Sequence, residues 1–235
     1  MTAGAWRAFP IEGSMRDSYT QVVVSLQIPM MADRCGCLSG AATRPRPSRD
    51  TIAAMESAQI RRLPRWPFPL DSDKAVEAAL FVVHRVTDPT LHSVSKVLYH
   101  ADKAHLARYG RPISGDRYVA MKHGPVPSAT YDMFKTLRGD SNFPLSERAR
   151  SAMAVEDYTV RALRAADESV LSTSEMECLA ASAAEHGNKS FYQRTADSHG
   201  PAWQAAGEND LIALECLLLE IDNSDELRAH LAQDD

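Results

Sequence analysis

The stretch from Lys96 to Tyr131 restricts the backbone more than any other part of this chain, because helix and turn signals follow one another almost without a gap. A helical pattern ends at Gly110, a position where glycine commonly terminates a helix by adopting positive φ. Gly115-Asp116 then predicts a tight turn, residues 117–122 a short extended segment, and Gly124-Pro125 a second turn. We therefore expect this stretch to fold as one unit against which the later part of the chain packs.

Periodic apolar residues predict helices around this unit. The helix that contains Lys96 should begin at Asp88-Pro89, where an N-cap residue precedes a proline suited to the first helical position. A capping box, Ser172-Thr173-Ser174-Glu175, should open another helix. The expected helices span residues 73–87, 89–109, 127–137, 159–166, 172–185, 191–198 and 209–221, and a short strand is expected near 152–155. The chain is thus predicted to be α+β and mainly α-helical, with one compact domain over residues 71–222.

Residues 1–70 differ from the rest in composition and charge. They hold seven of the 13 prolines, and nine arginines with no lysine against five acidic residues. Closely spaced prolines oppose regular structure, because proline lacks a backbone N–H and restrains its neighbour. We expect a basic, largely disordered leader; the alternatives are a basic interaction arm, or a translation start further along, for example at Met55. At the other end, residues 223–235 are expected to form a solvated acidic tail.

The sequence also bears on location and cofactors. It has no run of about 18 apolar residues, so no transmembrane helix and no membrane partner are expected. Cys35-Gly36-Cys37 has no second ligand pair to complete a zinc site, and Cys178 and Cys216 fit apolar helical patterns. Phosphate-binding loops, nucleophile elbows and zinc-protease motifs are absent from the sequence. We expect a cytoplasmic protein that is not an enzyme and needs neither a metal nor another cofactor.

Asp102 occupies an apolar position of the helix that ends at Gly110. Helical spacing gives this helix two stripes, one of Leu91, Val94, Leu98, Ala101 and His105, the other of Tyr99, Asp102, Leu106 and Tyr109. A carboxylate buried without hydrogen bonds is costly, so Asp102 must accept donors from nearby chain. Residues 114–124 are the natural source of those donors.

Two interpretations of the Asp and His side chains follow. We favour a polar network that fastens the turns to the helix. The alternative is a metal-dependent hydrolase, since Asp102 and His105 are three residues apart and face the same way on a helix. Its candidate residues are Asp102, His105, Asp116 and His123, a ligand set that is incomplete for a typical metal centre.

Basic residues suggest another alternative, a nucleic-acid-binding regulator that uses the face formed by residues 96–138. Local basicity can neutralise phosphates. The residues concerned are Lys96, Lys103, Arg108, Arg111, Arg117, Lys122, Lys135 and Arg138. The same residues fit a solvated helix face or a patch for an acidic protein, and no known nucleic-acid-binding motif accompanies them, so nucleic acid is the less favoured partner.

The ordered residues of this stretch resemble the Panacea domain family, whose namesake is the antitoxin SocA. The matching residues are Lys96, Leu98-Tyr99, Ala101-Asp102, Leu106, Tyr109-Gly110-Arg111, Gly115-Asp116, Tyr118, Ala120, His123-Gly124-Pro125-Val126 and Tyr131. Ser198-His199 with Trp203 is similar to a Thr/Ser-His…Trp element near the end of that domain. The resemblance extends over residues 73–221 and departs at His100, where the family usually has an aromatic residue.

The resemblance implies a bacterial or phage antitoxin that binds a toxin encoded beside it. It further implies an adaptor that holds the toxin and the ClpXP protease together, so the expected partners are a cognate toxin and ClpX. The residues expected to contact a partner are Lys96, Tyr99, Lys103, Tyr109, Arg111 and Lys122. The residues expected to hold the motif together are Asp102, His105, Gly110, Gly115, Asp116, His123, Gly124, Pro125, His199 and Trp203.

Overall fold

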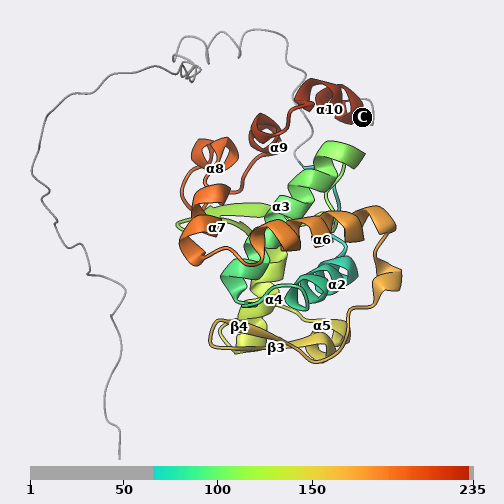
Figure 1. Ribbon diagram of the computed structural model, residues 1–235, viewed down its shortest axis with the longest axis vertical. Helices are drawn as coiled ribbons and strands as arrows, with labels where there is room; N and C mark the ends of the chain where they lie inside the picture. The colour runs from blue at the N-terminus through green and yellow to red at the C-terminus, as the bar shows by residue number, and fades with distance from the viewer. Residues whose placement is uncertain (1–65, 233–235) are drawn as a thin grey trace, which may run out of the picture. The chain divides into compact units, whose positions relative to one another are not determined.

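The computed structural model describes residues 66–232, which are mainly helical with two small antiparallel sheets (Figure 1). The first elements are α2 (Ser72–Val83), α3 (Leu91–Tyr109), β1 (Tyr118–Met121), β2 (Gly124–Pro127), α4 (Ser128–Arg138), α5 (Glu147–Ala152), β3 (Met153–Glu156) and β4 (Thr159–Ala162). The later elements are η1 (Glu168–Val170), α6 (Thr173–His186), α7 (Phe191–Ser198), α8 (Pro201–Ala205), α9 (Leu214–Leu217), η2 (Leu218–Glu220) and α10 (Ser224–Leu231). The predicted α+β, mainly helical fold class is confirmed.

The predictions for residues 1–65 lie outside the described residues. They concern the disordered leader, its alternatives, and the cysteine pair at Cys35 and Cys37. Trp66 and Phe68, which the sequence assigned to the leader, pack against the domain instead. No helix among residues 66–232 has the length and apolarity required to cross a membrane.

Helix α3 lies at the centre of the domain and contacts α2, α4, α6, α7 and β2. Its N-cap is Thr90, which forms a capping box with Ser93, so the helix begins two residues after the start predicted at Asp88-Pro89. Its end at Gly110, with φ of 73°, is confirmed. Twelve of its 19 residues are buried because other elements pack around it.

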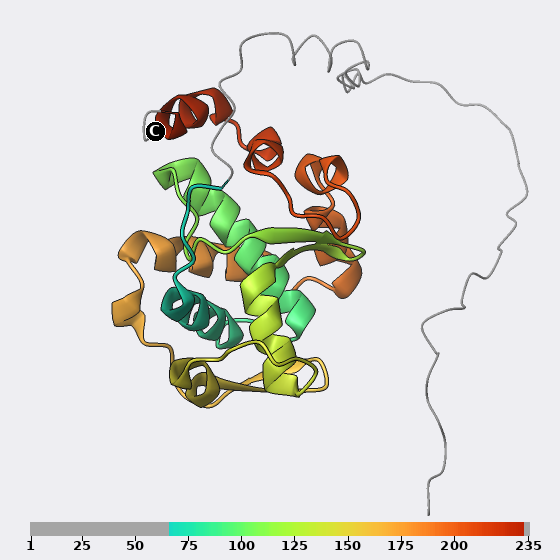
Figure 2. The same ribbon diagram turned by 180° about the vertical axis from the view of Figure 1, so that it is seen from behind.

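Strands β1 and β2 form a hairpin that lies across α3 (Figure 2). Tyr118 pairs with Pro127 and Met121 with Gly124, so the turn falls at residues 122–123 rather than at Gly124-Pro125 as predicted. Pro125 and Pro127 suggested a turn, yet both lie in strand β2. Proline is tolerated there because β2 is an edge strand, in which a missing N–H donor can face away from the partner strand. The predicted extended segment is confirmed, and its Tyr118 side chain is buried.

The predicted helix over 209–221 is wrong in its first part. Asn209 lies in a turn with φ of 64°, and the following residues run along the free edge of β1, where Leu211 forms a bridge with Val119. There the Ile212 N–H donates to the Tyr118 carbonyl oxygen at 2.8 Å. The helix that follows, α9, covers only four residues before η2. A short apolar run fits either a strand or a helix, and here the open edge of the hairpin decides between them.

A second hairpin, β3–β4, replaces the helix predicted over 159–166. Met153 pairs with Ala162, and Asp157, with φ of 52°, makes the turn. The strand expected near 152–155 is confirmed, whereas α5 was not predicted. The four residues of β4 are too few for apolar spacing to distinguish strand from helix.

The C-terminal segment is more structured than an acidic tail. Leu227 and Leu231 of α10 are buried in a cluster with Leu106 of α3, beside Trp66 and Phe68. Acidic residues of the first helical turn remain on the solvent side. Residues 224–231 therefore belong to the folded domain, because two leucines one turn apart give this helix an apolar face.

Candidate functional site

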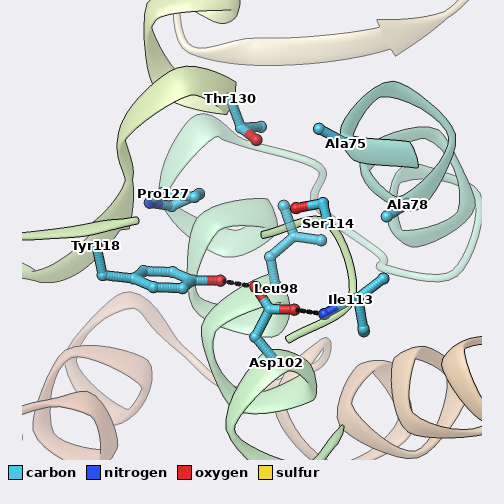
Figure 3. Close-up of a pocket in the computed structure, with 9 residues that line it drawn as sticks. All are labelled: Ala75, Ala78, Leu98, Asp102, Ile113, Ser114, Tyr118, Pro127 and Thr130. Carbon is cyan, nitrogen blue, oxygen red and sulfur yellow. Dashed lines mark hydrogen bonds between the residues drawn. The ribbon is translucent and has the colours of Figure 1, made fainter. Parts of the chain in front are cut away.

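Asp102 is the anchor of the predicted motif unit (Figure 3). Its Oδ1 accepts the Ile113 N–H at 2.7 Å, and its Oδ2 accepts the Tyr118 hydroxyl at 2.6 Å. Burial raises the pKa of Asp102 to about 7, although both hydrogen bonds act in the opposite direction. The cavity beside it holds only about 10 Å³, space for roughly one water molecule. The Asp102 carboxylate therefore links α3 to β1, and the cavity beside it is too small to be a substrate pocket.

Asp116 holds the beginning of α4. The N-cap residue of α4 is Pro127, whose side chain makes no capping hydrogen bond. The Asp116 carboxylate takes over this role from outside the helix, accepting the N–H groups of Ala129 at 3.0 Å and Thr130 at 2.9 Å. It satisfies donors that the first turn of a helix leaves free, and its negative charge suits the helix N-terminus.

Lys96 of α3 is buried beneath β2. Its Nζ donates to the Pro125 carbonyl oxygen at 2.8 Å, and no carboxylate within residues 66–232 approaches it closely enough to form an ion pair. Burial lowers the pKa of this amine to about 7. Gly124, with φ of 95°, allows Lys96 Nζ and Ser198 Oγ to come close to the backbone of the hairpin. The hairpin is thus wedged between α3 and α7.

The later motif element closes on the same hairpin. Trp203 Nε1 donates to the Met121 carbonyl oxygen at 2.9 Å, and the His199 ring stacks on the indole at a centroid distance of 3.8 Å. Residues 80 or more positions apart therefore meet at one strand. This explains why the Panacea-like pattern has two separate parts.

The candidate catalytic residues are not assembled into one site. Asp102 binds Tyr118, whereas His105 uses Nδ1 toward the Arg111 carbonyl oxygen and Nε2 toward Ser174 Oγ. His123 lies exposed at the hairpin turn. Among the described residues, no group of three or more His, Cys, Asp or Glu side chains could hold a metal ion. The geometry favours the fastening role for these groups.

The structure divides the six residues predicted to contact a partner. Lys96 and Tyr99 are 1% exposed, so neither offers a surface. Both side chains lie on the side of α3 that hairpin β1–β2 and residues 212–220 cover, so both are buried. Lys103 and Arg111 carry ion pairs with Glu220 at 2.7 Å and Glu175 at 2.8 Å. Tyr109 and Lys122 remain exposed.

The same ion pairs weaken the nucleic-acid interpretation. Of its eight basic residues, Lys96 is buried and four have carboxylate partners in the described part of the chain. Those four are Lys103, Arg111, Lys135 and Arg138. A phosphate backbone would have to compete with these carboxylates for each guanidinium or ammonium group.

Sequence reasoning missed an exposed aromatic surface, which we call the hairpin patch: Lys122, His123, Phe191 and Tyr192. Tyr192 is 82% exposed and Phe191 40% exposed. The Phe191 ring lies 5.2 Å from His123 and 5.7 Å from Tyr192, and it stacks on His92 from below at 4.1 Å. Two adjacent aromatic residues directly after the N-cap Ser190 are the signal in the sequence, since consecutive helical residues cannot both face the core.

His100, the departure from the family pattern, keeps an aromatic contact. Its ring stacks on His186 of α6 at 3.8 Å with an interplanar angle of 8°. Burial lowers the pKa of His100 to about 3, so the imidazole is neutral and packs as a flat ring. Both histidines line a groove of about 640 Å³ between α3, α6 and residues 220–223.

Comparison with known families accounts for this arrangement. The family model described as antitoxin SocA-like, Panacea domain, matches residues 94–204. This part of the chain is similar to a Panacea domain. The match contains both the Asp102 anchor and the His199–Trp203 stack, whereas α2, α9 and α10 pack on it from outside the matched range. No curated protein and no solved structure matches the chain.

The packing of hairpin β1–β2 against α7 can be tested with a matched pair of substitutions, Gly124→Ala and Gly139→Ala. Gly124 and Gly139 have φ of 95° and 94°, but a Cβ at Gly124 would collide with Ser198 Oγ, whereas one at Gly139 meets nothing within 4 Å. Alanine adds the same backbone strain at both positions. Gly124→Ala should therefore destabilise the protein by roughly 1–3 kcal/mol more than Gly139→Ala, as measured by urea unfolding. Equal losses would show that the hairpin is not wedged against α7.

Proposed function

We propose that this protein is an antitoxin that binds a toxin protein encoded beside it and neutralises it. The match to the SocA-like Panacea family carries this proposal. The arrangement of the motif residues supports it, because their polar groups are used in holding the fold together rather than in an open catalytic pocket. On this proposal the protein acts in the cytoplasm by binding and performs no chemistry of its own.

The hairpin patch is the surface we propose for the toxin contact. Exposed aromatic side chains are costly to leave in water and are enriched among residues that dominate protein–protein binding. Phe191 is held in place by the His92 ring beneath it, and Tyr192 extends further outward. Lys122 from the hairpin turn adds a cation that was among the residues predicted from sequence. Little side-chain freedom has to be lost at Phe191 on binding, which favours affinity.

Neutralisation would proceed by delivery of the toxin to the ClpXP protease. An adaptor needs no new chemistry, because tethering a substrate beside an unfoldase raises its effective concentration. It needs two surfaces, one for the toxin and one for ClpX. With the hairpin patch assigned to the toxin, the basic residues of the leader or the acidic C-terminal region remain for ClpX.

Tyr192→Ala should weaken toxin binding by roughly tenfold or more, because truncating a central interface aromatic commonly costs 1–2 kcal/mol or more. The measurement is isothermal titration of the full chain with the product of the adjacent gene. Tyr158→Ala is the matched control, since Tyr158 is an exposed tyrosine (57%) in the turn of the β3–β4 hairpin and is not part of the hairpin patch. Equal affinity for both variants would remove the hairpin patch from the proposal.

Degradation tests the adaptor step separately. Toxin should be lost over time only when the full chain, ClpX, ClpP and ATP are all present, and the Tyr192→Ala variant should slow this loss. Toxin that is neutralised but not degraded would replace delivery with simple masking. An adjacent gene product that is neither toxic nor bound would overturn the antitoxin proposal itself.

A further inference from the structure

A second pocket, separate from the hairpin patch in its chemistry, lies at the beginning of α7. Its volume is about 460 Å³, and it opens between the α2–α3 loop, the α6–α7 loop and the first turn of α7. The residues that define it are Thr87, Asp88, Asn188, Ser190, Phe191 and Arg194. None of the motif residues discussed above lines this pocket.

Arg194 at this pocket is a buried cation without a carboxylate partner. The residue is only 4% exposed, and the single hydrogen bond that its side chain makes within residues 66–232 runs from Nη1 to the Gly187 carbonyl oxygen at 3.2 Å. Its Nε is buried and has no acceptor among the described residues. The ion pairs of the described chain do not include it, although the Asp88 charge acts on it from a greater distance. Burying a guanidinium in this way is costly unless an anion compensates for it.

The start of α7 adds favourable electrostatics. Ser190 and Phe191 line the pocket, so the N-terminal end of this eight-residue helix faces it. The Ser190 side chain accepts only the Gln193 N–H, which leaves other first-turn N–H groups for an additional acceptor. A helix N-terminus together with an arginine is a frequent arrangement for binding carboxylate or phosphate groups.

We propose that this pocket binds an oxyanion, the carboxylate or phosphate group of a ligand, with Arg194 Nε as a donor. Two neighbouring N–H groups of a guanidinium can hold two oxygens of one such group. Asp88 on the pocket wall opposes the anion and limits its affinity. Phe191 borders both this pocket and the hairpin patch, but the inference rests on Arg194 and not on the aromatic side chains.

The resonance of the Arg194 Nε–H group provides a direct test by ¹⁵N-correlated NMR on the full chain. Inorganic phosphate, and in a second series acetate, should shift this signal saturably at constant ionic strength set with sodium chloride. We expect dissociation constants on the order of millimolar for these small probes. The internal control is the Nε–H group of Arg161 on β4, which donates to Glu156 on β3 at 3.2 Å and should not shift. A stronger response to phosphate than to acetate would indicate a phosphate ligand, and the reverse a carboxylate.

Two substitutions sharpen the test. Asp88→Asn removes the opposing charge from an exposed residue and should tighten phosphate binding roughly threefold or more. Arg194→Lys removes the Nε donor, so its binding is followed at the backbone N–H resonances of Phe191 and Tyr192, which should shift saturably with phosphate in the wild type and should not do so in this variant. A wild-type signal that does not saturate with either anion would overturn the proposal. So would weaker binding by Asp88→Asn, because Asp88 would then be a member of the site and not its competitor.

Discussion

Asp102→Ala is expected to lower the free energy of unfolding by about 2–4 kcal/mol, because it leaves two buried donors without an acceptor. These are the Ile113 N–H and the Tyr118 hydroxyl, and both bind the carboxylate in the folded protein. Loss of the anchor frees one end of β1 from α3, so the hairpin patch should also lose its position. Thermal unfolding followed by circular dichroism measures the effect, with a fall of roughly 4–16 °C for a domain of this size.

Glu208→Ala is a suitable control, since it removes a carboxylate from an exposed turn. It should change the melting temperature little. If Asp102→Ala melts like the wild type yet no longer binds toxin, Asp102 belongs to a contact surface and its role as a fastener is wrong.

The pH dependence of stability distinguishes the effect of the Asp102 charge from that of its side-chain shape. The folded-state pKa of Asp102 is raised by burial to about 7, from an ordinary value of 3.8. Its contribution to stability is therefore fully present below about pH 4 and is lost as pH rises through about 7. Over that window the wild type should lose up to about 4 kcal/mol relative to Asp102→Asn, which does not titrate. Parallel stability curves for the two proteins from pH 4 to 8 would contradict the raised pKa.

Glu77→Ala is expected to have the largest effect, a loss of about 3–5 kcal/mol, because it removes a buried anion that binds two partly exposed arginines and a backbone N–H group. Glu77 of α2 is 0% exposed. Its carboxylate accepts Nη1 of Arg164 at 2.9 Å, Nη1 of Arg148 at 2.8 Å and the Asp167 N–H at 2.7 Å. One side chain thus joins α2, α5 and the segment after β4. Urea unfolding should show the loss as a lower midpoint.

A double-mutant cycle isolates this interaction. Arg164→Ala should cost less than Glu77→Ala, and the double variant should recover part of the loss, since the cation and anion are removed together. Burial opposes ionisation of Glu77, but hydrogen bonds from Arg164, the Asp167 N–H and Arg148 lower its pKa below 4.5. Its stabilisation is therefore present above about pH 4.5 and is lost as pH falls through the folded-state pKa, the opposite direction to that of Asp102. Strictly additive losses in the cycle would mean that the two residues are not coupled.

Sequence reasoning succeeded where local chemistry is strong. The capping box at Ser172 and the glycine at 110 mark helix boundaries that the structure confirms. These signals concern hydrogen bonds within a few residues, so they depend little on the rest of the fold. The predictions failed at residues 159–162 and 209–212, where segments expected to be helical instead pair with a neighbouring strand that offers backbone hydrogen-bond partners.

The candidate site shows the same division. The sequence predicted that Asp102 must be satisfied by nearby donors, and the structure identifies Ile113 and Tyr118. The sequence analysis placed Lys96 and Tyr99 on a contact surface, but packing from distant segments buries them. The exposed pair at Phe191 and Tyr192 attracted no functional prediction, since periodicity shows only that some face must be exposed, not which partners leave it uncovered.

By itself, the sequence predicted the principal helices and the need to pair Asp102, because these follow from short-range backbone chemistry and from the cost of burying charge. The resemblance to the Panacea family rests instead on the ordered motif residues between Lys96 and Tyr131. Only the tertiary structure decided which basic residues are neutralised, which aromatic residues face water, and that Arg194 is buried without a carboxylate partner in the described chain. Those properties depend on contacts between segments far apart in the chain. One sequence pattern is compatible with many such contacts, and the packed core selects among them.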